Sequence, residues 1–272
     1  MKLTYLGTAA AEGMPAVFCN CEFCKKAREL GGKNIRSRSQ SIINDELLID
    51  LPMDTYFHFL QNGIEGDKIK YLLVTHSHRD HFYVEELLNR AVPFAHNMRC
   101  DKLQVFCGQG AFDKLSAIDK LGNVEFTKLN HFEEVKMGDY RVTAMPARHY
   151  PGDDALIYII KNGEKTVLYA HDTGYLFEEN FEYIKNNNIV FDMVSFDCTN
   201  VLIAAPDTGS HMGIENISRV IDRLKSINAI TPNTKKYINH FSHNANPLHD
   251  ELVNIAKEID CYASYDGCVV EI

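Results

Sequence analysis

The most informative segment of this 272-residue chain is Thr75-His76-Ser77-His78-Arg79-Asp80-His81. It follows the apolar residues 70–74, which are expected to form a buried strand. In an extended segment residues i and i+2 share a face, so His76 and His78 can approach one ion together. Asp80 and His81 follow as the chain turns and can face a second ion. Neutral imidazoles together with a carboxylate suit zinc, iron or manganese, so the segment predicts a metal site.

Around this segment, short apolar runs alternate with amphipathic runs. We expect strands at residues 2–6, 46–50, 70–75, 103–107, 140–145, 155–161, 166–170, 191–196, 236–239 and 268–272. We expect helices at residues 53–61, 84–92, 110–121, 177–186, 214–226 and 248–258. The alternation predicts an α/β fold in which helices cover strands. Residues 1–272 are interpreted as a single domain, with two similar halves that meet near residue 130.

Other polar residues share the position of His76 directly after an expected strand, namely Asp172, Asp197 and His240. Strand ends are the places where a rigid sheet holds residues of a functional site. We therefore expect these side chains to gather at one edge of the fold.

Composition limits the classes of function. The formal net charge of −9 repels the phosphate backbones of nucleic acids at long range, so a nucleic-acid substrate is disfavoured. The chain has no apolar run near the roughly 18 residues that a membrane helix needs, so a membrane is not an expected partner. Residues 1–13 also lack the apolar stretch of a signal peptide. We therefore expect a cytoplasmic protein.

Three of the eight cysteines crowd into residues 19–24, as Cys19, Cys21 and Cys24. In a cytosolic chain such a cluster is typical of metal ligands, and three thiolates favour a structural zinc that needs a fourth ligand. We predict that His243 is the fourth ligand. Because residues i and i+3 leaving a strand point to opposite sides, His240 and His243 can serve two different metals. The alternative is three free cysteines in a loop.

The motif HSHRDH at residues 76–81 resembles the HxHxDH signature of the metallo-β-lactamase-fold hydrolases. The later motifs of that family are matched in order by His149 in Pro146-Ala-Arg-His149, by Asp172 in Ala170-His-Asp172-Thr-Gly and by His240 in Tyr237-Ile-Asn-His240. The resemblance spans essentially the whole chain and implies a four-layer αββα sandwich. It also implies two divalent catalytic ions, zinc or manganese. The implied ligands are His76, His78 and His149 for one ion, Asp80, His81 and His240 for the other, and Asp172 as the bridge.

Within this family, the cysteine cluster and the His-x-x-His pair at His240 and His243 resemble the PhnP-type phosphoribosyl 1,2-cyclic phosphate phosphodiesterases. The resemblance implies a metal-dependent phosphodiesterase that cleaves a small, cyclic or open, sugar or nucleotide phosphodiester. His211 matches a non-ligand histidine of these enzymes and is expected to protonate the leaving group, with Asp197 orienting it. The residues expected to act in catalysis are Asp80, Asp172 and His211. The family also implies a homodimer.

Three arginines are candidates for binding a substrate phosphate. Arg148 precedes His149, and Arg36 and Arg38 follow the cysteine cluster. Each has an alternative interpretation: Arg148 in a salt bridge, and Arg36 and Arg38 in a solvated loop.

Other functions remain open at this point. One alternative is tRNA 3′-end processing of the ribonuclease Z type, which the acidic charge disfavours. Another is hydrolysis of a lactone, thioester or β-lactam; Asp172 argues only against the true β-lactamases, which have cysteine there. A third is a non-catalytic accessory role, because a related cysteine loop occurs in the pyrroloquinoline-quinone biosynthesis protein B.

Overall fold

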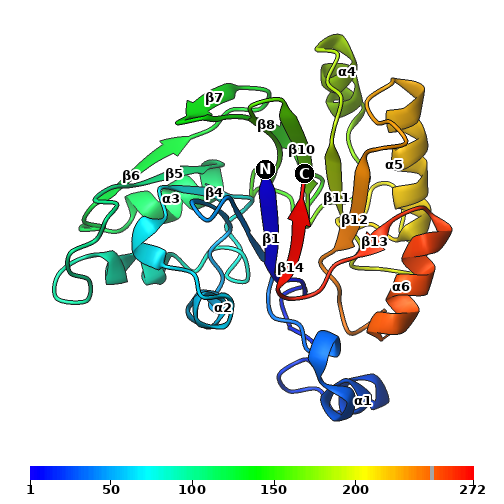
Figure 1. Ribbon diagram of the computed structural model, residues 1–272, viewed down its shortest axis with the longest axis horizontal. Helices are drawn as coiled ribbons and strands as arrows, with labels where there is room; N and C mark the ends of the chain where they lie inside the picture. Colours follow the sequence, from blue (N-terminus) through cyan, green and yellow to red (C-terminus); the bar gives the residue numbers. More distant parts are fainter. Residues whose placement is uncertain (246–247) are drawn as a thin grey trace.

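The structure of the protein is a computed structural model that describes residues 1–245 and 248–272. Two seven-stranded mixed sheets pack face to face, with helices on the outer face of each, as Figure 1 shows. This is the αββα sandwich expected from the sequence. Within the described residues, no helix has both the length and the apolar character that crossing a membrane requires.

The first sheet has the strand order β14-β1-β2-β3-β4-β5-β6. Its strands are β14 (Cys268–Glu271), β1 (Lys2–Gly7), β2 (Gln40–Ile43), β3 (Leu47–Ile49), β4 (Tyr71–Val74), β5 (Leu103–Cys107) and β6 (Val124–Lys128). The pairings from β14 to β3 are antiparallel, and those from β3 to β6 are parallel. The last strand thus returns to the first sheet, where Lys2 lies opposite Glu271.

The second sheet has the order β13-β12-β11-β10-β9-β8-β7. Its strands are β7 (Glu134–Met137), β8 (Tyr140–Pro146), β9 (Leu156–Asn162), β10 (Lys165–Ala170), β11 (Met193–Asp197), β12 (Lys235–Asn239) and β13 (Tyr262–Ala263). The chain crosses from the first sheet to the second between β6 and β7. Strands β10 to β13 are parallel, so their carboxyl ends meet at one edge.

The core consists of three apolar layers. Between the sheets lie side chains such as Leu73 and Tyr158, both fully buried. The outer face of the second sheet is covered by α4 (Glu178–Asn186), α5 (Ile214–Ser226) and α6 (His249–Glu258). The outer face of the first sheet packs on α3 (Gln109–Ser116), on the 3₁₀ helix η3 (Val84–Arg90) and beside α2 (Thr55–Asn62). Burial of apolar surface in these layers is the main source of stability.

Several local predictions need correction. The expected helix at 84–92 is the 3₁₀ helix η3, and β2, β6, β7 and β13 were not expected as strands. Residues 19–24 are only partly a loop, because Cys21 is the N-cap of a helix, α1 (Glu22–Leu30), that contains Cys24. The remaining short 3₁₀ helices are η1 (Gly32–Asn34) and η2 (Gly66–Lys68). Gln40 and Ser41, which follow the candidate arginines Arg36 and Arg38, are buried in β2.

Candidate metal centre and active site

The histidine segment follows β4 and enters the junction between the two sheets. His76 and His81 are buried, whereas His78 is partly exposed. The rings of His76 and His78 lie 4.7 Å apart, and the ring of His149 lies 4.6 Å from that of His76. The alternation of an extended segment thus places His76 and His78 beside a histidine that follows β8.

Asp172 lies at the centre of the cluster, directly after β10, in a left-handed conformation with φ 50°. Its Oδ2 lies 3.3 Å from Nε2 of His76, 3.2 Å from Nε2 of His81 and 3.7 Å from Nε2 of His240. Its Oδ1 lies 3.2 Å from Nδ1 of His149. One carboxylate therefore faces histidines from both halves of the fold.

The donor atoms form two overlapping sets whose members lie within 4.8 Å of one another. One set is His76, His78 and His149, and the other is Asp80, His81, Asp172 and His240. Nε2 of His76, Nδ1 of His149 and Oδ1 of Asp172 are buried yet have no hydrogen-bond partner in the described part of the chain. Buried polar atoms nearly always have a partner. These three atoms are of the kinds that coordinate metal ions, imidazole nitrogen and carboxylate oxygen, so the site fits a bound metal ion.

The electrostatics of the cluster suit metal binding. Burial, together with neighbouring His81, lowers the pKa of His76 well below its ordinary value. Burial raises the pKa of Asp172, but the surrounding histidines, His240 first, lower it by more than burial raises it. The resulting pKa is well below the ordinary range. A neutral imidazole and an ionised carboxylate are the forms that bind a divalent ion.

Buried polar groups orient two of the histidines. Nδ1 of His81 donates to Oδ2 of Asp50 at 2.7 Å, and the backbone N–H of Thr75 donates to Oδ1 of the same carboxylate at 2.7 Å. Nδ1 of His240 donates to Oγ1 of Thr199 at 2.8 Å. Both contacts leave Nε2 of the histidine directed at Asp172, as expected for groups that hold metal ligands in place.

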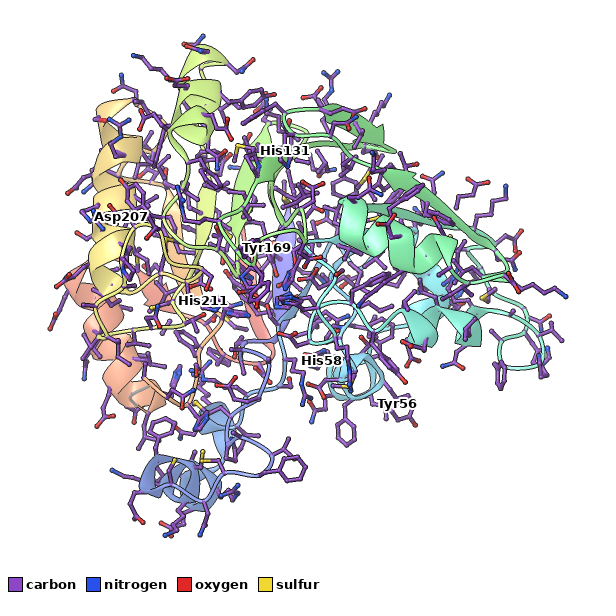
Figure 2. The ribbon with its side chains drawn as sticks, turned by 180° about the vertical axis from the view of Figure 1, so that it is seen from behind. Tyr56, His58, His131, Tyr169, Asp207 and His211 are labelled. Atoms are coloured by element: carbon purple, nitrogen blue, oxygen red, sulfur yellow. The ribbon has the colours of Figure 1, made fainter. Side chains whose placement is uncertain are left out.

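His211 lies on the loop before α5, as labelled in Figure 2, and contacts the same cluster. Its Nδ1 lies 3.0 Å from Oδ1 of Asp172 and 3.7 Å from Oδ2 of Asp197. Burial lowers the pKa of His211, but the two carboxylates raise it to about 11. Asp197 is itself held by the backbone N–H of Met212, at 2.8 Å, and by Thr199. His211, Asp172, Asp197 and His240 together form a further group within ligand distance of one another.

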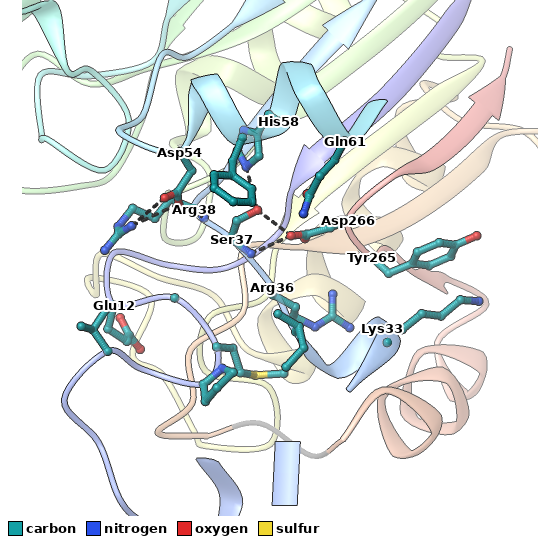
Figure 3. A pocket seen from close by; sticks show the side chains of 17 residues that line it. Glu12, Lys33, Arg36, Ser37, Arg38, Asp54, His58, Gln61, Tyr265 and Asp266 are labelled. Atoms are coloured by element: carbon teal, nitrogen blue, oxygen red, sulfur yellow. Dashed lines mark hydrogen bonds and ion pairs between the residues drawn. The ribbon is translucent and has the colours of Figure 1, made fainter. Parts of the chain in front are cut away.

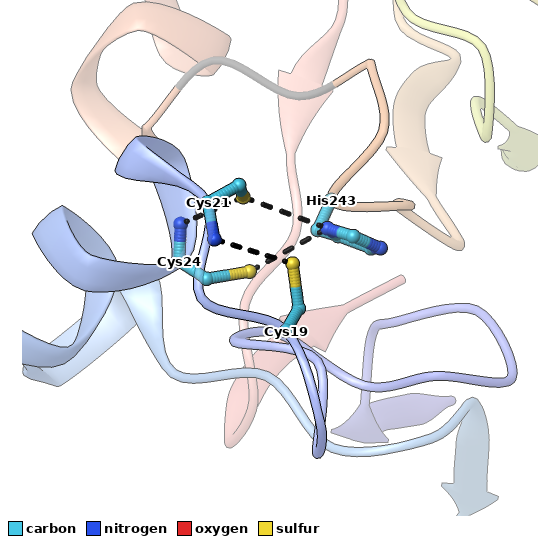
Figure 4. Close-up of side chains that lie close together, drawn as sticks. All are labelled: Cys19, Cys21, Cys24 and His243. Carbon is cyan, nitrogen blue, oxygen red and sulfur yellow. Dashed lines mark hydrogen bonds between the residues drawn. The ribbon is translucent and has the colours of Figure 1, made fainter.

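The cysteine cluster assembles as expected, with Cys19, Cys21, Cys24 and His243 in one group, shown in Figure 4. Nδ1 of His243 lies 3.5 Å from Sγ of Cys24 and 4.0 Å from Sγ of Cys21. The backbone N–H of Cys24 donates to Sγ of Cys21 and lowers the pKa of that thiol to about 6. A Cys₃His set with an easily formed thiolate fits a tetrahedral zinc.

The three candidate arginines lie outside the histidine cluster. Arg148 donates from Nε to the carbonyl oxygen of Tyr175 at 3.1 Å and stacks on Phe177 at 4.0 Å. Arg38 pairs with Asp54 at 3.0 Å. Arg36 is buried and donates to Oγ1 of Thr8, at 2.8 Å, in the wall of the cavity of about 720 Å³ that Figure 3 shows. Each of the three arginines thus already has a contact within the protein. Their binding of substrate stays a prediction.

A second cavity, of about 520 Å³, opens onto the histidine cluster. Its wall includes His78, Asp80 and His149, together with His211 and Glu12. A small molecule in this cavity would therefore touch both proposed ligand sets and the non-ligand histidine.

Sequence reasoning missed Asp50, Thr199 and Asp153 as parts of the site. Asp153 accepts from Oγ of Ser77 at 2.5 Å and lies 3.9 Å from Nε2 of His78. Asp50 had a signal, because it directly follows β3 just as Asp172 follows β10. Thr199 and Asp153 lie in loops, where the sequence carries no comparable signal.

Comparison with known proteins identifies the family. The sequence profile of the β-lactamase superfamily domain matches residues 50–240, a span that contains every histidine and aspartate of the two ligand sets. Among curated proteins, ribonuclease Z of Picrophilus torridus is 25% identical over 143 residues. That alignment covers 51% of this chain and only 40% of the relative.

Solved structures show the same fold at low sequence identity. A diphosphatase from the PhnP family superposes with a TM-score of 0.74 at 18% identity, covering 100% of this chain and 97% of the other. Zn²⁺-bound PqqB from Methylobacterium extorquens superposes with a TM-score of 0.73 at 16% identity, covering 100% of each chain.

Proposed function

The chain belongs to the metallo-β-lactamase superfamily of metal-dependent hydrolases, and on that premise we propose that it is a phosphodiesterase for small phosphodiesters. The observation that carries the proposal is the convergence of two histidine sets on the single carboxylate of Asp172. Two adjacent ions held in this way suit a phosphodiester, which presents both an attacked phosphorus and a leaving oxygen.

The residues divide into three proposed metal sites. His76, His78 and His149 would hold one catalytic ion, and Asp80, His81 and His240 would hold the other, with Asp172 within reach of both sets; either zinc or manganese suits these donors. When bound, such ions polarise a phosphoryl oxygen and lower the pKa of water to about 7. Cys19, Cys21, Cys24 and His243 hold a separate structural zinc.

The chain's own residues supply positioning and a proton. Asp50 and Thr199 fix the rings of His81 and His240, so neither ring has to reorient when a substrate enters. Nδ1 of His211 faces the carboxylates of Asp172 and Asp197, which leaves its Nε2 to protonate the leaving alkoxide.

The test is an assay of purified protein on bis(p-nitrophenyl) phosphate, with metal content measured on the same sample. We expect about three metal ions per chain and turnover that is lost in His78→Ala. Chelation followed by addition of zinc or manganese should remove and then restore the activity. No turnover in a fully metallated sample would refute the phosphodiesterase and leave an ester or thioester hydrolase or an accessory protein.

Processing of tRNA is a second candidate, supported by the similarity to ribonuclease Z over 143 residues. The net charge of −9 argues against it, because a tRNA nuclease needs cationic surface to hold its substrate. A tRNA precursor with a 3′ trailer discriminates the two: cleavage at the trailer junction at physiological salt would favour the nuclease.

A further inference from the structure

Apart from the proposed metal ligands and His211, the charge on the wall of the catalytic cavity is acidic. Outside the proposed metal ligands and His211, Glu12 is the charged residue of this wall in the described part of the chain. Its carboxylate accepts a hydrogen bond from Oγ of Ser242 and lies 3.9 Å from Nε2 of His243. No lysine or arginine belongs to the wall within residues 1–245 and 248–272. A terminal phosphate carries a charge near −2 at neutral pH, and away from the proposed metal ions and His211 it would meet the carboxylate of Glu12 instead of a lysine or arginine.

The cations nearest in sequence to the site are directed elsewhere. Arg148 points along Phe177 and donates to the carbonyl oxygen of Tyr175. Arg79, inside the histidine segment, is exposed and points at Sδ of Met53 at 3.5 Å. Arg38 remains paired with Asp54. Clamping a second phosphate would therefore require breaking a contact that each arginine already makes.

Two exposed side chains of the cavity wall are large and apolar. Tyr150 is 68% exposed, with its ring centroid 6.0 Å from that of His78, and Ile203 is 51% exposed. Both belong to the cavity wall. Large apolar side chains left in water at the rim of a site favour a ligand that covers them with a ring or another flat apolar group.

From these observations, and resting on the proposed phosphodiesterase function, we infer the class of substrate. It is a phosphodiester with a single negative charge whose organic part bears a ring and no second phosphate. The scissile phosphate lies at the histidine cluster, the ring lies against Tyr150 and Ile203, and Glu12 rejects any terminal phosphate.

The test uses a pair of substrates that differ by one phosphate, adenosine 2′,3′-cyclic phosphate and its 5′-phosphorylated derivative. We expect kcat/KM to be lower for the 5′-phosphorylated member by about tenfold or more, from like-charge repulsion. The inhibition constants of the corresponding products, adenosine 3′-monophosphate and adenosine 3′,5′-bisphosphate, should differ in the same direction. This second readout does not depend on turnover.

Two variants separate local charge from net charge. Glu12→Gln removes the carboxylate from the wall. It should reduce the ratio of kcat/KM between the two paired substrates by about threefold or more. Glu164→Gln is the control, because it removes the same charge from the exposed turn between β9 and β10 and should leave the ratio unchanged. Equal effects of the two variants would overturn the role of Glu12.

The ring contact is tested at Tyr150. Tyr150→Ala should raise KM for adenosine 2′,3′-cyclic phosphate about tenfold and leave kcat nearly unchanged, whereas Tyr150→Phe should behave like the parent chain. Unchanged KM in Tyr150→Ala would overturn this contact.

The outcomes distinguish the inference from the function on which it rests. Preference for the 5′-phosphorylated substrate, or equal turnover of the pair, would overturn the inference and leave the phosphodiesterase standing. Turnover of bis(p-nitrophenyl) phosphate with neither nucleotide accepted would overturn the inference as it applies to nucleoside rings and leave the phosphodiesterase standing. If all three esters are inert in metallated protein, the proposed function itself fails.

Discussion

Nδ1 of His81 donates a 2.7 Å hydrogen bond to Oδ2 of Asp50, and both side chains are fully buried. The bond orients the ring of His81 so that its Nε2 lies 3.2 Å from Oδ2 of Asp172 and is directed at the proposed metal site. A residue with no place in either ligand set thereby determines how one ligand presents its donor atom.

Replacing Asp50 tests this relationship. Asp50→Asn removes the charged acceptor and frees the ring of His81, so we expect affinity for the catalytic metals to fall about 10- to 100-fold. Competition with a chromophoric chelator measures that affinity. Asp45→Asn is the matched control, since Asp45 is exposed and pairs only with Lys2 in the described chain. Unchanged metal affinity in Asp50→Asn would contradict a role in orienting His81.

His211 is tested through the leaving group. His211→Asn should lower kcat about 10²- to 10⁴-fold for a diester with an alkyl leaving group, which needs a proton on departure. The loss should be far smaller for bis(p-nitrophenyl) phosphate, because p-nitrophenolate leaves without protonation. Metal content should stay at the parent level. Equal losses on both substrates would show that His211 does not protonate the leaving group, and His131→Asn, at a surface pair with Asp154, serves as the control.

The cysteine site is tested by its zinc and by stability. Cys21→Ser should lower the metal content by about one ion per chain and destabilise the fold by roughly 3 kcal/mol or more, as loss of a structural metal does. Metal analysis and thermal unfolding measure the two effects. Cys100→Ser, outside the cluster, should change neither. A parent-level metal content in Cys21→Ser would remove this thiol from the ligand set.

His58 predicts a dependence of stability on pH. It is fully buried between Ser37 and Gln40, and burial lowers its pKa to about 4. The unfolded chain then binds the proton more readily than the folded chain. The contribution of His58 to the free energy of unfolding is therefore fully present above pH 6.5 and is lost as the pH drops from 6.5 toward 4. The loss at pH 4 is on the order of 3 kcal/mol. Chemical unfolding of the parent chain and of His58→Gln across this range should show a shallower slope in the variant.

His96→Gln is the control for that experiment, since His96 is exposed and its substitution should leave the slope unchanged. Parallel slopes for the parent chain and His58→Gln would show that His58 is not responsible.

Much of the fold was predictable because its signals are local. Nearly every strand that supplies a ligand was expected from an apolar run, and His76, Asp172 and His240 were recognisable from their place directly after such runs. The strands β6 and β7 were not predicted, because their side chains are largely exposed and polar and so form no clear apolar pattern.

The site was less predictable where its geometry depends on distant segments. Asp153 approaches His78 from a loop 75 residues further along the chain, and no local sequence pattern predicts that contact. Arg36 is a second example of a contact that depends on distant segments. Arg36 follows a polar stretch of sequence, yet it is buried and donates to Thr8 and to the carbonyl oxygen of Ser264, which lie far from it in the chain.

The position of the histidine cluster also constrains how the protein matures. His76 comes from the end of β4 in the first sheet, and His240 follows β12 in the second, so neither half carries a complete ligand set. If the proposed ligand sets hold two ions, those ions would not nucleate folding as zinc does in a zinc finger. Metal loading would then follow docking of the two sheets, and an occupied site would report that both halves of the chain have reached their final places.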